Sequence, residues 1–251
     1  MRKTLIAGIS ALAFSTLLST PVQAADIGSG FSVNGGATVV SDYRFRGISQ
    51  TDKRFAVQGT FTIAHSSGFY ATVWGSSIDD YVADGGDQEI DLIGGYKHTF
   101  SGTTLDVGVL YYYYPGSAQI TPGWNSDFFE PYVSVAHTFG PLTAKVTANY
   151  APKQAALSIG SGKEDNLYLA GDLSAGIPNT PISVSGHIGH SWGPSYLTIG
   201  KEYTDWNVGV SYTTGPLTLG VQYVDTDGDF FTPSGRNASK AGVVGSIGVS
   251  F

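Results

Sequence analysis

Apolar and polar residues alternate along most of the chain with a period of two, which is the pattern of β-strands that present one face to an apolar environment. Residues 142–150 show it plainly, since every second residue of LTAKVTANY is apolar or aromatic. The pattern predicts twelve strands, near residues 31–47, 54–64, 69–77, 88–98, 103–114, 127–138, 142–151, 164–176, 181–191, 204–213, 217–226 and 239–251. We therefore expect an all-β fold.

The connections between these strands are of two kinds that alternate strictly. Short turns lie at 65–68, 100–102, 140–141, 177–180 and 215–216. Longer segments rich in Gly, Ser, Pro and Asp lie near 48–53, 78–87, 115–126, 152–163, 192–203 and 227–238. Antiparallel strands joined in this order, with both chain ends on the short-turn side, predict an up-and-down β-barrel.

Composition decides what surrounds the barrel. Only 13% of the 251 residues are charged, the chain has 34 Gly, 15 Tyr and no Cys, and its mean hydropathy is +0.02. These values argue against helical membrane proteins, disulfide-stapled folds, thiolate zinc sites and cysteine catalysis. The polar faces carry Ser, Thr, Gly, Asn and Tyr instead of the Lys and Glu of a soluble exterior. We expect a transmembrane barrel, because only a closed sheet satisfies every strand edge in a bilayer.

Aromatic residues gather where the predicted strands end, as two membrane interfaces would select. The turn side has Phe31, Phe69, Tyr96, Phe100, Phe139, Tyr212 and Phe251. The loop side has Tyr43, Phe45, Phe55, Tyr111, Tyr113, Tyr150 and Tyr223. The last strand places Phe251, Val249 and Ile247 on one face, and this pattern resembles the signal by which outer-membrane barrels are recognised for assembly.

The N-terminus predicts export. Met1, Arg2 and Lys3 precede a mostly apolar stretch over 4–18, and Ala24 closes a small-residue cleavage site. We predict a cleaved signal peptide over 1–24 and one barrel domain over 25–251. Loss of Arg2 and Lys3 leaves 11 basic residues against 20 acidic ones, a net charge of −9, which argues against nucleic acid as a partner.

Several motifs resemble a known family. They are DYRFRGISQ (42–50), AVQG (56–59), SGFYA (67–71) with VW (73–74), EIDL (89–92) with GGY (94–96), and TDW (204–206). The sequence is similar to the TorF-like porins of Gram-negative proteobacteria, most densely over 37–100. The resemblance implies an outer-membrane β-barrel and supports a porin.

Charged residues on the polar face are the candidates for function. Asp42, Arg44 and Arg46 share one face near the loop end of the first predicted strand, and four carboxylates lie at the loop ends of others: Glu89, Asp91, Glu130 and Asp205. A basic pair facing carboxylates would create a transverse field that sets solute preference. The alternative is that these groups pair across the lumen and brace the wall. Deeper in the lumen, internal ion pairs are expected from Lys97, Asp106, Lys145 and Asp172.

These features favour a passive, weakly cation-preferring diffusion channel for small hydrophilic solutes, with no cofactor, no metal and no catalytic step. The expected partners are the lipids and lipopolysaccharide of the outer membrane, the barrel-assembly machinery and the solutes themselves. Two alternatives stay open, a closed structural barrel that acts through its outer loops and, less favoured, a barrel hydrolase.

Overall fold

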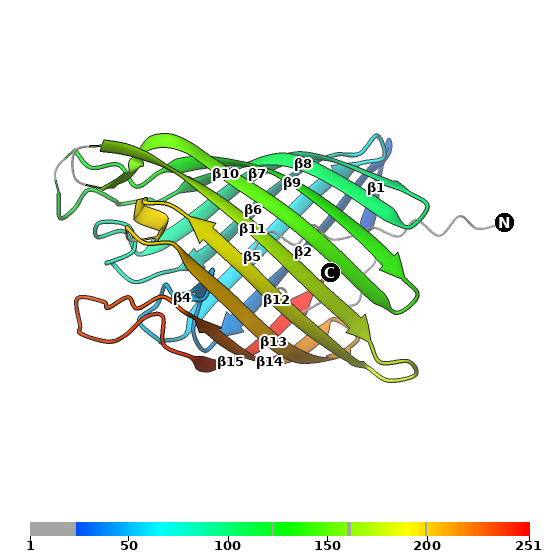
Figure 1. Cartoon of the computed structure of the whole chain (residues 1–251). Helices are drawn as coiled ribbons and strands as arrows, with labels where there is room; N and C mark the ends of the chain where they lie inside the picture. The colour runs from blue at the N-terminus through cyan, green and yellow to red at the C-terminus, as the bar shows by residue number, and fades with distance from the viewer. Residues whose placement is uncertain (1–23, 122, 160–161, 199) are drawn as a thin grey trace.

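The computed structural model describes residues 24–121, 123–159, 162–198 and 200–251, which form a closed antiparallel β-barrel (Figure 1). Every wall strand pairs with its neighbours along the chain, and β15 closes on β2. The twelve wall strands are β2 (Phe31–Val40), β5 (Ala56–His65), β6 (Phe69–Ser77), β7 (Gln88–Phe100), β8 (Thr103–Tyr113), β9 (Phe128–Phe139), β10 (Leu142–Ile159), β11 (Gly162–Gly176), β12 (Ile182–Trp192), β13 (Tyr203–Thr214), β14 (Leu217–Thr226) and β15 (Gly242–Ser250). The predicted up-and-down fold is confirmed, while residues 1–23 of the predicted signal peptide lie outside the described residues.

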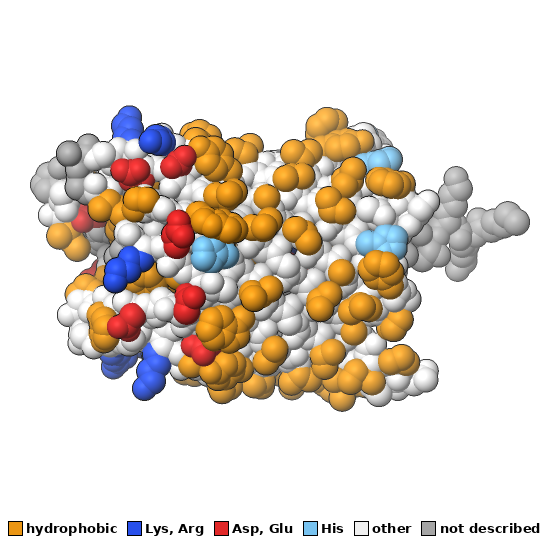
Figure 2. Space-filling model, viewed as in Figure 1, with side chains coloured by type: hydrophobic (Ala, Val, Ile, Leu, Met, Phe, Trp, Pro, Cys, Tyr) orange, Lys and Arg blue, Asp and Glu red, His pale blue; other side chains and the backbone are white. Residues whose placement is uncertain are grey.

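The alternation of the sequence turns apolar side chains outward. Val107, Ile188, Val208 and Val243 are each more than half exposed on the outer wall. Figure 2 shows apolar side chains over the flank of the barrel and charged ones gathered at one end. The described helix, η1 (Tyr196–Thr198), is a single turn, and no helix in the described parts of the chain is long and apolar enough to span a membrane. An exposed apolar belt on a closed wall is the surface of a membrane barrel.

The predicted boundaries are wrong by several residues at two places, of which the first is the β10–β11 hairpin. β6 and β14 have the predicted ends, but the predicted loop over 152–163 is wrong, because β10 and β11 continue into it. Gln154 pairs with Glu164, and Ile159 with Gly162, after shifts in register. This extension follows Pro152, where the regular alternation ends. The β10–β11 hairpin therefore reaches beyond the rest of the wall at the loop end.

The predicted first strand over 31–47 is also wrong in its second half. β2 ends at Val40, and β3 (Arg44–Phe45) pairs with β4 (Ile48–Ser49) in a separate small hairpin. Ser41 ends the wall pairing, since its N–H donates to the Gly245 carbonyl. As a result, Tyr43 is buried instead of belonging to the outer aromatic belt that was expected.

The seam of the barrel lies between β15 and β2. The N–H groups of Gly35 and Phe251 donate to each other's carbonyls at 3.0 and 2.9 Å. Beyond this point β1 (Ala25–Gly28), which the sequence pattern did not predict, pairs with residues 31–33 of β2. Phe251, Val249 and Ile247 all face outward and are at least half exposed. Their predicted role in assembly stays a prediction.

Candidate functional site

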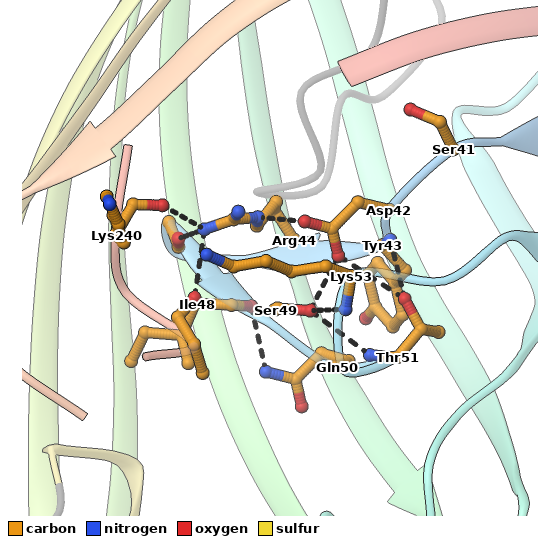
Figure 3. Close-up of polar contacts among 12 residues, drawn as sticks. Ser41, Asp42, Tyr43, Arg44, Ile48, Ser49, Gln50, Thr51, Lys53 and Lys240 are labelled. Carbon is orange, nitrogen blue, oxygen red and sulfur yellow. Dashed lines mark hydrogen bonds and ion pairs between the residues drawn. The ribbon is translucent and has the colours of Figure 1, made fainter. Parts of the chain in front are cut away.

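Residues 42–49, here called the lumen hairpin, fold back into the barrel (Figure 3). The ring of Tyr43 lies 5.5 Å from that of Trp74 on β6. Gly47 packs against Asp205 on β13, where an added Cβ would lie 2.9 Å from the Asp205 Cβ. Because β6 and β13 lie on different sides of the wall, the hairpin crosses the lumen.

Arg46 forms the tip of the lumen hairpin and fixes it to the wall. It has φ of 47° beside Gly47 with φ of 81°, the geometry of a two-residue turn of type I′. Its Nη2 lies 2.7 Å from Glu130 Oε1, Nη1 lies 2.9 Å from Asn166 Oδ1, and the guanidinium lies 4.1 Å from the ring of Tyr168.

The ion pair of Arg46 and Glu130 is fully buried, since both side chains have 0% exposure. Burial by itself would lower the pKa of Arg46, but the Glu130 carboxylate raises that pKa above its ordinary value. Arg46 therefore keeps its positive charge inside the lumen. The pair braces the hairpin tip against the wall, which is the alternative to a role in selectivity.

Arg44 holds the other side of the lumen hairpin. Its Nε lies 2.6 Å from Asp42 Oδ2, and its Nη1 donates to the carbonyls of Ala238 and Lys240 at 2.9 and 3.2 Å (Figure 3). The two carbonyls belong to the long connection between β14 and β15. Asp42, Arg44 and Arg46 thus lie in the lumen, as expected, but on the inserted hairpin and not on a wall strand.

The segment that follows the hairpin is fastened to outer loops. Ser234 Oγ donates to Asp52 Oδ2 at 3.1 Å, and Arg236 Nη1 donates to the Asp52 carbonyl at 2.9 Å. From a different loop, the hydroxyl of Tyr81 donates to the carbonyl of Ser49. The hairpin is therefore held from the wall and from two loops at the mouth.

Glu89 and Asp91 face the lumen hairpin from β7. Glu89 accepts a hydrogen bond from the Tyr43 hydroxyl at 3.1 Å, and the two carboxylates are 2% and 0% exposed. Neither of them belongs to an ion pair in the described part of the chain. The expected mouth cluster is therefore present, but its basic groups pair with Asp42 and Glu130, and not with Glu89 or Asp91.

A second set of charged groups follows the lumen wall toward the turn side. Lys97 Nζ lies 3.8 Å from Asp106 Oδ2, and Lys145 lies opposite Asp172 in the β10–β11 register. These four are the residues predicted to form internal pairs. Two further charged groups adjoin them, His187 on β12 and Asp205 on β13. We call the six residues together the charged chain: Lys97, Asp106, Lys145, Asp172, His187 and Asp205.

His187 joins the charged chain to the hairpin. Its Nδ1 lies 2.7 Å from Asp172 Oδ1, and its Nε2 lies 3.1 Å from Asp205 Oδ1. The hydroxyl of Tyr168, on whose ring Arg46 lies, donates to Asp205 Oδ2 at 3.0 Å. Sequence reasoning missed His187, although its place on the polar side of the period-two pattern of residues 182–188 marks it as facing the lumen.

The charges are confined to one side of the wall. All of the inward-facing Asp, Glu, Lys and Arg of the described wall strands lie on β7–β13, the charged arc. The remaining strands β14, β15, β2, β5 and β6, the neutral arc, contain one charged residue, Asp225. It faces outward and accepts a hydrogen bond from the outward Tyr223 hydroxyl. Inward positions of the neutral arc carry Thr38, Gln58, Thr60, Gln222 and Ser246.

Water reaches the charged chain but not the hairpin tip. The side chains of Asp172 and Lys97 are 37% and 19% exposed, whereas those of Arg46 and Glu130 are 0% exposed. The lumen is therefore packed at the level of the hairpin and accessible to solvent nearer the turn side.

Comparison with known proteins identifies the sequence group and the fold. A family model described as a bacterial protein of unknown function (Gcw_chp) matches residues 24–251, and no curated protein matches. The structure is similar to a NanC porin, with a TM-score of 0.59 and 14% identity over 87% of this chain and 98% of that one. It is also similar to a structure from work on in-meso crystallization of membrane proteins, with a TM-score of 0.54 and 12% identity over 87% and 83%. Likeness at this identity shows a shared barrel fold, and none of these matches supports the TorF-like name.

Proposed function

Because the chain belongs to the Gcw_chp family of bacterial proteins of unknown function, we propose its role from the barrel itself: a channel of the bacterial outer membrane for small hydrophilic solutes. The observation that carries this proposal is a charged chain that is open to water at Asp172 and Lys97, inside a closed wall with an apolar exterior. Transfer of charged side chains from water into the interior costs free energy, and a barrel that serves only as a scaffold gains nothing in return. Charged groups that line a solvated lumen instead act on whatever passes them.

The lumen hairpin is the constriction of the proposed channel. It narrows the loop end, because its tip at Arg46 and Gly47 packs against the wall without exposure to water, and solutes must enter past the hairpin before they meet the charged chain. The path needs no chemical step and no cofactor. We place the long loops outside the cell, facing the lipopolysaccharide leaflet, and the short turns on the periplasmic side.

A weak preference for cations is part of the proposal. Glu89 and Asp91 are 2% and 0% exposed beneath the lumen hairpin, so the preference does not rest on them. It rests on the net charge of −9 that remains after export. A negative protein raises the local concentration of cations and lowers that of anions.

One observation favours the alternative, a closed barrel that acts through its loops. The hairpin packs against strands on opposite sides of the wall and is fastened by two outer loops. A hydrolase has less support, because the described hydrogen bonds bring no serine and carboxylate to the same imidazole.

Conductance in planar bilayers separates these functions. The purified barrel is expected to give stepwise currents in KCl and a reversal potential on the cation side in a salt gradient. A barrel closed by its hairpin would give no current until Arg46→Ala loosens the tip. Absence of steps in both proteins would overturn the channel proposal.

A further inference from the structure

The charged chain has signs that alternate from one group to the next. Lys97 on β7 lies beside Asp106 on β8. Across β9, Asp106 interacts electrostatically with Lys145 on β10, which lies opposite Asp172 on β11. His187 then lies between Asp172 and Asp205, as described above. Each positive group therefore has a negative neighbour on an adjacent strand, along one side of the lumen.

The chain carries no net charge. Both ring nitrogens of His187 lie at hydrogen-bond distance from carboxylate oxygens, and a histidine that donates from both nitrogens is an imidazolium. With Lys97 and Lys145, it balances the three carboxylates of the chain. The chain therefore presents separated charges without favouring cations or anions as a class.

The opposite wall offers hydrogen bonds and no charge. The neutral arc faces the lumen with residues such as Thr60, Gln58 and Gln222, while Asp172 on the charged arc has 37% of its side chain exposed. A solute in the lumen thus meets charges of both signs on one side. On the other side it meets uncharged residues, several of which can take the place of water as hydrogen-bond partners.

We propose that the charged chain binds zwitterionic solutes, small molecules with an ammonium and a carboxylate a few bonds apart, as in an amino acid. The inference rests on the proposed channel function and names its solute class. A zwitterion contacts an exposed carboxylate and an exposed ammonium at once, as charge-assisted hydrogen bonds. An ion of one sign gains one contact and is repelled by the alternate neighbour.

Swelling of liposomes that contain the purified barrel tests the solute class with four probes of similar size. Serine is zwitterionic, serinamide is cationic, glycerate is anionic and glycerol is neutral. Serine is expected to enter roughly fourfold faster than glycerol at low concentration, the effect of about two water-exposed ion pairs. Serinamide and glycerate are expected to lack this advantage.

The double variant Lys145→Gln with Asp172→Asn isolates the cause. It removes one pair of opposite charges and leaves the net charge unchanged, so the reversal potential in KCl should stay the same. The serine-to-glycerol ratio should fall to about one, while glycerol entry is retained. The matched control Asp225→Asn, on the outer wall, should keep the wild-type ratio.

The outcomes separate the solute class from the channel itself. Glycerol entry with no serine advantage, or an advantage that the double variant keeps, overturns the zwitterion proposal and leaves the channel standing. No swelling with any probe overturns both. If the double variant does not fold, Asp172→Asn alone removes the 37% exposed carboxylate of the chain, and an unchanged serine ratio there overturns the proposal.

Discussion

The charged arc and the neutral arc are built on the same wall but differ in what they place inside it. Both alternate apolar and polar residues and both turn Val, Leu and Ile toward the outside. The charged arc has ions among its inward residues, and some of them pair across neighbouring strands, such as Lys97 and Asp106. The neutral arc has no ion at its inward positions, which include Thr, Ser, Gln and Gly. The contrast indicates that the outward residues determine the barrel fold, whereas the inward residues determine which solutes the lumen can accept.

The two arcs also hold the lumen hairpin by different means. Arg46 reaches the charged arc and pairs with a wall carboxylate, Glu130. Arg44 reaches toward the neutral arc, which offers no inward carboxylate, and donates to the backbone carbonyls of Ala238 and Lys240. The hairpin is therefore attached by an ion pair on one side and by carbonyl groups on the other.

Removal of the ion pair between Arg46 and Glu130 should give the largest loss of stability. Arg46→Ala leaves Glu130 buried without a counter-charge, and we expect a loss of about 3–5 kcal/mol in the free energy of unfolding. Urea unfolding of the detergent-folded barrel, followed by tryptophan fluorescence, measures it. Adding Glu130→Gln should recover part of the loss.

The matched control is Arg54→Ala. Arg54 pairs with Asp79, but its side chain is 65% exposed, so the change should cost about 1 kcal/mol or less. Equal losses for Arg46→Ala and Arg54→Ala would contradict the bracing role of the hairpin tip.

A substitution at the seam between β15 and β2, in the neutral arc, should give the next largest loss of stability. A Cβ on Gly35 would lie 2.9 Å from Phe251 Cζ and 2.9 Å from the Thr60 carbonyl, so Gly35→Ala should destabilise the barrel by about 1–3 kcal/mol through overpacking. The temperature at which the folded band moves to the position of the unfolded chain on a gel measures this loss, and it should be lower for Gly35→Ala. Gly94→Ala on β7, where an added Cβ meets nothing within 4 Å, should cause no loss.

A charge added to the neutral arc should change ion preference. Gln58→Lys places an ammonium in the lumen opposite the charged arc. A charge about 8 Å from a passing ion in watery surroundings is worth about 0.5 kcal/mol, roughly a twofold change in permeability ratio. The reversal potential in a KCl gradient should shift toward anions. A shift toward cations, or none, would show that ions do not pass along this arc.

The smallest effect is expected outside the lumen. Asp225 lies on the neutral arc but hydrogen-bonds the outward Tyr223 hydroxyl. Asp225→Asn should leave the reversal potential unchanged and alter stability by less than about 0.5 kcal/mol. A clear shift in selectivity would place this carboxylate on the ion path and break the contrast between the arcs.

The sequence predicted the wall well, because period-two alternation reports directly on the two faces of a strand. It failed at residues 42–49, where DYRFRGIS keeps alternating although the chain has left the wall. The turn there contains Arg46-Gly47, and Arg has none of the preference of Asn or Asp for positive φ. The position becomes understandable only through Glu130 and Asn166, partners far away in sequence.

The candidate charges were predicted better than their pairing. The sequence placed Lys97, Asp106, Lys145 and Asp172 in the lumen, since each falls on the polar face of a strand. Which of these residues meet depends on the register between paired strands, and the period-two pattern carries no information about that register. The link through His187 appears only when β11, β12 and β13 are aligned.

Accessibility of one introduced cysteine tests the central claim most directly, because the chain has no cysteine of its own. Thr60 faces the lumen from the neutral arc, whereas Val57 on the same strand faces the lipid and is 63% exposed. In Thr60→Cys, single-channel current should fall in a step when a water-soluble methanethiosulfonate reagent is added, and the current of Val57→Cys should stay constant. A Thr60→Cys channel whose current the reagent leaves unchanged from both sides would contradict a water-filled passage between the two arcs.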